Sequence, residues 1–316
     1  MPEERGEWTV RRALQWTAED LATRGSTTAR LDAELLLAHA LGTTRLGLYL
    51  AHDRPLEPAQ RSALRSHVER RRKGEPVAYI LGRKEFYGLD FFVDGRVLVP
   101  RPETERLVDA VLEALPVHSV GGRVLDLGTG SGAVAIAVAR ARPTVDVDAV
   151  DLSEDALVVA RRNALRHAAI RVRAIRGDLF AGLPLSARYD VVVSNPPYIA
   201  TGDLQGLPVD VALWEPRSAL DGGADGLALV RRIVSEAPRW LSPNGRLCLE
   251  VGAGQAPTVR DLVAAVGAFD PALAIRDYAG IERVVVADLR KTVEDRLPQD
   301  HERIQQRETV GGKAGG

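Results

Sequence analysis

Hydrophobic and polar positions follow two different periods along the chain, and the change of period separates two parts. Up to about residue 75 the apolar residues recur at helical spacing, so we expect a small helical bundle over residues 1–75. From about residue 105, short apolar runs alternate with amphipathic helical patterns, which predicts an α/β domain with a mostly parallel sheet covered on both faces. The expected strands are 122–127, 145–150, 170–175, 189–194, 245–251, 273–278 and 282–287, and the expected helices of this part are 103–115, 132–141, 153–167, 225–240 and 255–267.

Between these two parts, residues 76–100 have the pattern of a β-hairpin. Aromatic and β-branched residues form two runs, 86–93 and 96–99, and Asp94-Gly95 separates them. An Asp-Gly pair is typical of the tight turn of a hairpin. We therefore expect a hairpin linker over 76–100, with its turn at Asp94-Gly95, ahead of the α/β domain at 101–287.

The end of the chain adds a feature to the expected sheet. The strands predicted at 273–278 and 282–287 are joined by Ala279-Gly280-Ile281 alone, so they are expected to be antiparallel neighbours. A doubly wound sheet with such an ending resembles the Rossmann-like, seven-stranded methyltransferase fold. Residues 288–316 are charged and rich in glycine, and we expect them to form a disordered tail.

Composition narrows the class of protein. The 316 residues carry a formal net charge of −1, which argues against a direct nucleic-acid substrate, although a local basic patch is compatible with it. No stretch reaches the ~20 apolar residues of a membrane span, and the charged N-terminus lacks the apolar region of a secretion signal. The single cysteine, Cys248, lies in an apolar run and is expected to be a buried core thiol. These observations predict a cytoplasmic protein that has no membrane partner.

A glycine-rich loop follows the first strand of the expected sheet. Residues 124–127 are apolar except for one aspartate, and the loop Gly128-Thr129-Gly130-Ser131-Gly132 then opens the next helix. Glycines let a ligand lie against the backbone, and Gly128, Gly130 and Ala133 fit the loose dinucleotide pattern G-x-G-x-x-G/A. A tight turn between a strand and a helix also uses glycines. The strand before the loop and the helix after it favour a nucleotide-like ligand.

Acidic residues after the next two strands extend this candidate site. Asp151 ends the second strand, where a carboxylate meets ribose hydroxyls in nucleotide-binding folds; capping the helix that begins near Ser153 is a second, compatible role. Asp178 follows the third strand and can accept a hydrogen bond from an adenine amino group, with Leu179 or Phe180 against the ring. A cap or turn role is the alternative for Asp178. To this point the pattern fits both a dehydrogenase and an enzyme that uses S-adenosylmethionine (SAM).

The loop Asn195-Pro196-Pro197-Tyr198 distinguishes these two classes. It follows an apolar strand, and two prolines cannot continue a strand inside a sheet. The Asn195 side-chain carbonyl and the Pro196 backbone carbonyl can each accept one N–H of a planar NH2 group, while Tyr198 packs on its flat face. This arrangement would aim the nitrogen lone pair at a methyl sulfonium and stabilise the charge that develops on nitrogen, a need that hydride transfer does not have.

Together these residues resemble the HemK/PrmC family, the peptide chain release factor N5-glutamine methyltransferases, over about residues 8–287. The Asn-Pro-Pro-Tyr loop is shared with adenine-N6 DNA methyltransferases and some guanine-N2 RNA methyltransferases, whereas residues 76–82 (PVAYILG), 85–88 (EFYG) and 99–105 (VPRPETE) are more specific. The resemblance implies that residues 128–132 and Asp151 hold SAM, which leaves as S-adenosylhomocysteine. It also implies that Asn195 touches both SAM and substrate, and that Pro196, Pro197 and Tyr198 bind the substrate glutamine. Leu179 falls where some members have Trp.

The resemblance further implies a partner, namely the Gly-Gly-Gln loop of bacterial class I release factors, which the N-terminal helical domain helps to grip. We expect direct displacement of the methyl group by the glutamine amide nitrogen, and no metal site. Two alternatives stay open: an amino methyltransferase acting on ribosomal protein L3 glutamine or on a nucleic-acid base, and a non-catalytic module that binds SAM or a nucleotide. Glu250, which ends the fifth strand, is interpreted as a structural group or as one that supports the residues of the site. The segment 101–105 is interpreted as the start of a helix, and a contribution to the substrate gate stays open as an alternative. Residues 70–73 are interpreted as a solvated helix end.

Overall fold

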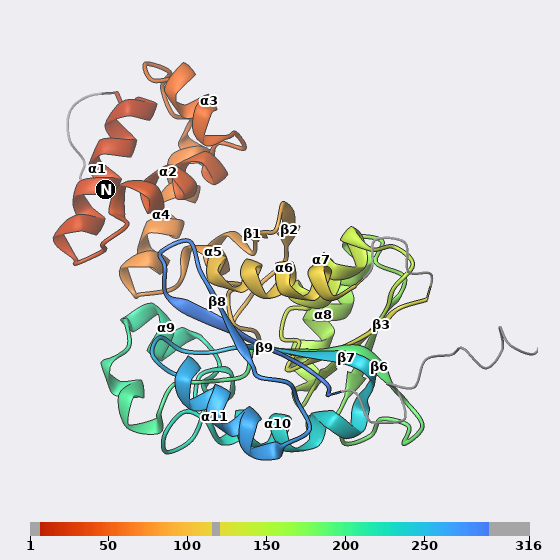
Figure 1. The fold of residues 1–316 in the computed structure, drawn as a ribbon. Helices are drawn as coiled ribbons and strands as arrows, with labels where there is room; N and C mark the ends of the chain where they lie inside the picture. The colour runs from red at the N-terminus through yellow and green to blue at the C-terminus, as the bar shows by residue number, and fades with distance from the viewer. Residues whose placement is uncertain (1–6, 116–120, 291–316) are drawn as a thin grey trace, which may run out of the picture.

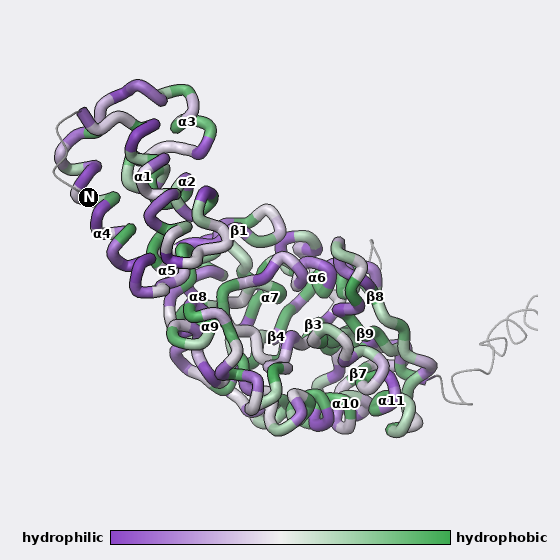
Figure 2. Tube along the Cα trace, turned by 90° about the vertical axis from the view of Figure 1, so that its left-hand side faces the viewer, coloured by the Kyte–Doolittle hydropathy of each residue, from purple (hydrophilic) through white to green (hydrophobic). Residues whose placement is uncertain are grey.

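The computed structural model describes residues 7–115 and 121–290, which form a helical unit and a larger α/β unit (Figure 1). Figure 2, turned by 90°, again shows the helical unit projecting from one end of the α/β unit, so the molecule is elongated in both views. No helix in these two ranges is long and apolar enough to cross a membrane. The disordered tail predicted from residue 288 onward lies outside the described residues beyond Arg290.

The N-terminal unit is a bundle whose helices bury leucines against one another. Leu14, Leu36 and Leu64 come from three different helices and are 0–1% exposed. The Thr9 side chain accepts a hydrogen bond from the Arg12 backbone N–H and so caps the first helix. The helical bundle that the sequence predicts for this part of the chain is confirmed. The helices are α1 (Val10–Thr23), α2 (Ala29–Ala40), α3 (Arg45–Leu50) and α4 (Pro58–Arg72).

The hairpin of the linker exists, but its predicted turn at Asp94-Gly95 is wrong. Strands β1 (Lys84–Phe86) and β2 (Leu89–Phe91) pair antiparallel across Tyr87-Gly88, which have φ values of 51° and 71°. Two residues with positive φ form the type of turn that matches the twist of a two-residue hairpin. Asp94 belongs to a separate turn, in which its carbonyl accepts from Val97 N at 3.1 Å. The linker also contains a short helix that was not predicted, α5 (Val77–Leu81).

The α/β unit is built on the seven-stranded sheet that the sequence predicted. The strand order is β5-β4-β3-β6-β7-β9-β8; β9 is antiparallel to both neighbours, and the other pairs are parallel. The order therefore reverses between β3 and β6, and ligands of doubly wound sheets bind beside such a reversal. The strands are β3 (Arg123–Leu127), β4 (Asp146–Asp151), β5 (Val172–Arg176), β6 (Tyr189–Ser194), β7 (Leu241–Glu250), β8 (Leu273–Arg276) and β9 (Glu282–Asp288).

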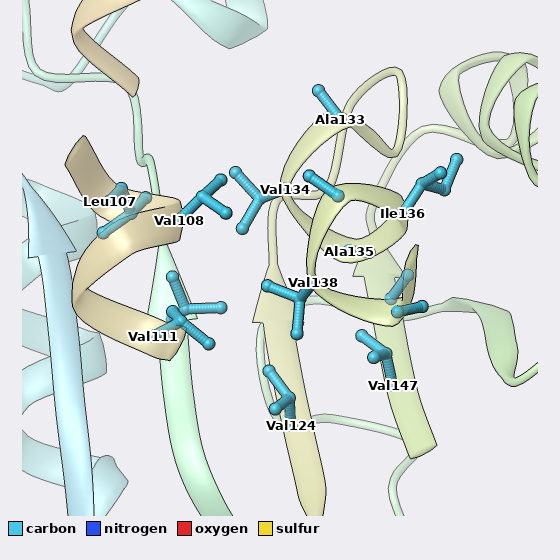
Figure 3. Packing of buried hydrophobic residues seen from close by; sticks show 14 of the residues in the cluster. Leu107, Val108, Val111, Val124, Ala133, Val134, Ala135, Ile136, Val138 and Val147 are labelled. Carbon is cyan, nitrogen blue, oxygen red and sulfur yellow. The ribbon is translucent and has the colours of Figure 1, made fainter. Parts of the chain in front are cut away.

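Helices cover both faces of this sheet because successive strand residues point to opposite sides. Val124 belongs to the cluster that includes residues of α6 and α7, and Figure 3 shows Val138 of α7 next to it, whereas Leu125 belongs to the cluster on the other face. Cys248 is buried in the first of these clusters, as predicted. The first face carries α6 (Glu105–Ala114), α7 (Ala133–Ala141) and α8 (Glu154–Arg166), and the second carries α10 (Ala228–Trp240) and α11 (Ala256–Val266).

The two units are joined by contacts at the end of α4. The Arg71 side chain is 12% exposed and pairs with Asp32 at 2.9 Å and with Asp210, on helix α9 (Val209–Trp214), at 3.6 Å. Trp214 Nε1 donates to the carbonyl of Lys73 at 3.3 Å. The interpretation of residues 70–73 as a solvated helix end is therefore wrong, because this segment connects the helical unit to the α/β unit.

Candidate active site

A cavity of about 390 Å³ opens at the carboxyl ends of β3, β4, β5 and β6. The glycine loop forms part of its wall. Gly128 and Gly130 have φ values of 71° and 54°, and a Cβ added to either would meet nothing within 4 Å. The backbone of the loop is therefore open to the cavity, as a ligand that lies against it requires.

Gly132 has a different role from the two glycines before it. A Cβ at this position would lie 2.9 Å from Ile136 Cδ1 and 3.3 Å from the Ala160 Cβ, so Gly132 allows α7 and α8 to approach each other. It does not line the cavity, whereas the other predicted loop residues do. Those lining residues are Gly128, Thr129, Gly130 and Ser131.

Asp151 braces the glycine loop from the next strand. Its Oδ2 accepts from Gly130 N at 2.9 Å, and its Oδ1 accepts from Ser153 N at 2.9 Å. Ser153, not Asp151, is the N-cap of α8, because its side chain accepts from Ala156 N. The predicted capping role of Asp151 is therefore wrong, and its carboxylate stays at the wall of the cavity.

Residues 178–180 divide between the cavity and the core. Asp178 lines the cavity and accepts from both terminal nitrogens of Arg232 at 3.0 Å. Leu179, with φ 54°, also lines the cavity. Phe180 is 3% exposed and stacks on Trp240, with 5.6 Å between ring centroids. Of the two predicted adenine contacts, the structure brings Leu179 to the cavity and directs Phe180 into the core.

The Asn-Pro-Pro-Tyr loop starts directly beside the glycine loop. Ser194 is paired with Leu127 across β3 and β6, and its hydroxyl donates to the Leu127 carbonyl at 2.7 Å. Asn195 and Pro197 line the cavity, whereas the other two predicted loop residues, the buried Pro196 and the half-buried Tyr198, do not. The sequence-predicted cofactor and substrate loops therefore meet at one wall.

Two glycines and a glutamine hold this loop from behind. A Cβ at Gly222 would lie 2.6 Å from the Pro197 carbonyl oxygen, and one at Gly226 would lie 2.3 Å from that of Tyr198. Gln255 Nε2 donates to the same Tyr198 oxygen at 2.9 Å. These supports were not predicted from the sequence, although Gly222-Gly223 and Gly226 form a visible cluster in it.

Three further polar residues of the site were not predicted. Asp126 lines the cavity, is 2% exposed and accepts from the Thr129 hydroxyl at 2.7 Å; burial raises its pKa to about 7. Thr104 lines the same cavity and accepts from Asn195 Nδ2 at 3.2 Å. Arg101, beside it, pairs with Glu215, whose pKa is raised by burial although Arg101 opposes that shift. The position of Asp126 just before the glycine loop was the one sequence pattern that could have placed it in the site.

The sheet order, the antiparallel β9 and the cavity beside the strand reversal define a Rossmann-like methyltransferase domain. Comparison with known proteins agrees. Residues 12–82 match the family described as the PrmC N-terminal domain, and residues 106–215 match the Methyltransferase small domain.

Curated relatives extend this likeness over most of the chain. The release factor glutamine methyltransferase of Geobacter sulfurreducens is 47% identical over 278 residues, which cover 88% of this chain and 96% of the relative. The protein of the same name from Bordetella pertussis is 47% identical, covering 81% of this chain and 93% of the relative. The chain belongs to the release factor glutamine methyltransferase family.

A solved structure supports the fold alone. The catalytic domain of hMettl16, in complex with the MAT2A 3'UTR hairpin 6, has a TM-score of 0.53 and 14% identity, covering 76% of this chain and 87% of that one.

Proposed function

We propose that this protein methylates the side-chain amide nitrogen of a glutamine in bacterial class I release factors, with SAM as the methyl donor. The observation that carries the proposal is the position of Asn195: its amide lines the cavity of the glycine loop and is anchored to Thr104 at 3.2 Å. The names of the relatives at 47% identity support the substrate class.

The shape of the cavity and the carboxylate at its wall are compatible with SAM. Open space above Gly128 and Gly130 is the cradle that a nucleoside with a charged side chain needs, and Asp151 lies at the wall where ribose hydroxyls would bind. We expect residues 128–131, Asp151, Asp178 and Leu179 to hold it. When bound, SAM supplies a methyl group on a positively charged sulfur; transfer to nitrogen breaks the S–CH3 bond, leaves S-adenosylhomocysteine and releases one amide proton.

The chemical problem for the protein is the weak nucleophilicity of an amide nitrogen, whose lone pair is delocalised into the carbonyl. Asn195 Nδ2 is used by Thr104, so Asn195 Oδ1 is the end of the side chain that can accept a substrate N–H. Pro197, which also lines the cavity, would pack against the amide plane. The second acceptor at Pro196 and the contact with Tyr198 stay predictions from the sequence, because neither residue lines the cavity. Acceptors of this kind stabilise the positive charge that grows on nitrogen.

A second cavity supports a protein as the substrate. It has a volume of about 1180 Å³ and is lined by residues of both units, including Arg71 from the helical unit and Asp210 from α9. Arg101 lines both cavities, so they are neighbours. A loop that carries the substrate glutamine could reach Asn195 from this side while its parent protein contacts the helical unit. Because the proposed substrate acts in translation, we expect the reaction to take place in the cytoplasm. The net charge of −1 argues against a nucleic-acid substrate.

The test is incubation of the protein with SAM and a class I release factor, followed by mass spectrometry of the Gly-Gly-Gln peptide. A gain of one methyl group on the glutamine is expected for the wild type, and none for Asn195→Ala, which should still bind SAM. An unmodified glutamine, or transfer to DNA or rRNA instead, would refute the proposed substrate.

A further inference from the structure

Glu250 is a buried carboxyl beside the Asn-Pro-Pro-Tyr loop. The parallel ladder pairs Ser194 of β6 with Leu249 of β7, and the next residues of these strands are Asn195 and Glu250. Glu250 is 1% exposed, and its Oε2 has no hydrogen-bond partner among the described residues. Burying a carboxyl oxygen without a partner costs free energy, so its place next to the site requires an explanation.

Thr104 connects this carboxyl to Asn195. The Thr104 hydroxyl is buried and accepts from Asn195 Nδ2 at 3.2 Å. The Thr104 and Asn195 side chains are also close enough to Glu250 to lower the pKa of its carboxyl, so both groups face it. A hydroxyl has one proton to donate. Because its oxygen is taken up by Asn195, that proton is free to point at Glu250, and the three groups then form a directed chain from amide to hydroxyl to carboxylate.

We propose that Glu250 is a positioning residue which, through Thr104, holds the Asn195 amide with its Oδ1 toward the substrate, and that methyl transfer requires the ionised form of Glu250. The inference rests on the proposed function of Asn195. An ionised carboxylate can only accept, so the Thr104 proton must point to it and the Asn195 NH2 must be the end that faces Thr104. A protonated Glu250 can itself donate to Thr104 Oγ1. The Thr104 proton is then no longer committed to Glu250 and can be donated to Asn195 Oδ1, so the amide is not held in one orientation.

The surroundings of Glu250 set the pH range of this effect. Burial raises its pKa to about 7, hydrogen bonding from Thr104 and the charge of Arg283 oppose the shift, and the charge of Glu103 adds to it. Arg283 is itself paired with Asp277 at 3.1 Å. Tyr198 also faces Glu250, and burial first and then this carboxyl raise the Tyr198 pKa. Methyl transfer should therefore decline as the pH falls below about 7.

The experiment measures kcat between pH 6 and pH 9 with release factor and SAM in excess. For the wild type, kcat should rise about tenfold per pH unit below the pKa of one required carboxylate and level off above it. Glu250→Gln keeps an acceptor oxygen but cannot ionise, so its kcat should be lower by about tenfold and independent of pH. Asp126→Asn removes a carboxyl that lines the cavity and whose pKa is also raised to about 7, and this variant should keep the wild-type dependence of kcat on pH.

A second pair of variants tests the same chain of hydrogen bonds at Thr104. Thr104→Val removes the hydroxyl at constant shape and should lower kcat by about 10- to 100-fold, with the affinity for SAM unchanged, whereas Thr104→Ser should restore most of the loss. Glu250→Gln combined with Thr104→Val should be no slower than Thr104→Val alone, because both act through one chain. The inference would be overturned if Glu250→Gln had the wild-type kcat and if its kcat rose with pH as that of the wild type does.

The wild-type reaction separates this failure from that of the proposed function. If the wild type methylates the release-factor glutamine while Glu250→Gln behaves like it, Glu250 alone loses its role. If the wild type leaves the glutamine unmodified at every pH, the proposed function fails and this inference fails with it.

Discussion

Arg101 Nη2 lies 2.7 Å from both carboxylate oxygens of Glu215. The two residues are far apart in sequence, one just before η1 (Pro102–Thr104) and the other just after α9, and both line the second cavity. Glu215 is 1% exposed in its side chain and Arg101 33% exposed. The ion pair therefore ties the segment that carries Thr104 to the helix that faces the N-terminal unit.

Glu215→Ala should lower the free energy of unfolding by about 1–2 kcal/mol, below the usual cost of breaking a buried pair, because water can still reach Arg101. It should also raise the KM for the release factor, since both segments border the second cavity. Urea denaturation and steady-state kinetics measure the two effects. Glu282→Ala breaks the exposed pair with Arg276 at 3.1 Å and should cost less than about 1 kcal/mol. Equal stability of the two variants would contradict the structural role of Glu215.

Gly226→Ala should slow methyl transfer by about 100-fold with little change in SAM affinity, because its Cβ would lie 2.3 Å from the Tyr198 carbonyl oxygen and displace the Asn-Pro-Pro-Tyr loop. Gly254→Ala is the matched control. Gly254 has φ 82° against 77° for Gly226, so an alanine meets similar backbone strain there, but its Cβ would have nothing within 4 Å. Kinetics that show the same kcat for both variants would mean that strain, and not the clash with Tyr198, decides the effect.

Leu179 and Phe180 are neighbours in sequence, yet they should respond differently to truncation. Leu179→Ala should weaken SAM binding by about tenfold, since Leu179 lines the cavity. Phe180→Ala should lower stability by about 3–5 kcal/mol through the cavity that it leaves beside Trp240, with SAM affinity in the surviving folded protein close to wild type. Calorimetric titration with SAM and thermal denaturation distinguish the two. A large loss of SAM affinity for Phe180→Ala with none for Leu179→Ala would reverse the assignment.

These two residues also show where sequence reasoning ends. The strand before them was predicted at 170–175 and lies at Val172–Arg176, because apolar residues alternate with arginines along this half-buried edge strand. After the strand, alternation no longer tells which side chain faces the cavity. Leu179 has a positive φ, which a propensity scale does not predict for leucine, and this single dihedral turns Leu179 to the cavity and Phe180 to the core.

The turn of the hairpin and the contact between Thr104 and Asn195 could not be predicted from the sequence either. Asp94-Gly95 is the better turn by composition, but Tyr87-Gly88 forms it, because the short strands on either side pair Glu85 with Asp90. The site loops were predicted in place because each follows its own strand. Thr104 could not be assigned to Asn195, since a contact between a helix start and a distant strand end depends on how α6 packs, which no local pattern encodes.

Asp126 should make the free energy of unfolding of the ligand-free protein decrease as the pH rises. Burial raises its pKa from 3.8 to about 7, so between these values the folded state holds a proton that the unfolded state has lost. The free energy of unfolding therefore falls as the pH rises through this window. The total loss, on the order of 3–4 kcal/mol, is reached above pH 7. Asp126→Asn keeps an acceptor for the Thr129 hydroxyl and cannot ionise. Its melting temperature should match the wild type near pH 4 and exceed it at pH 8.5; Glu250, which shifts in the same sense, is present in both proteins and cancels. A difference in melting temperature that stays constant from pH 4 to pH 8.5 would show that Asp126 does not bear this penalty.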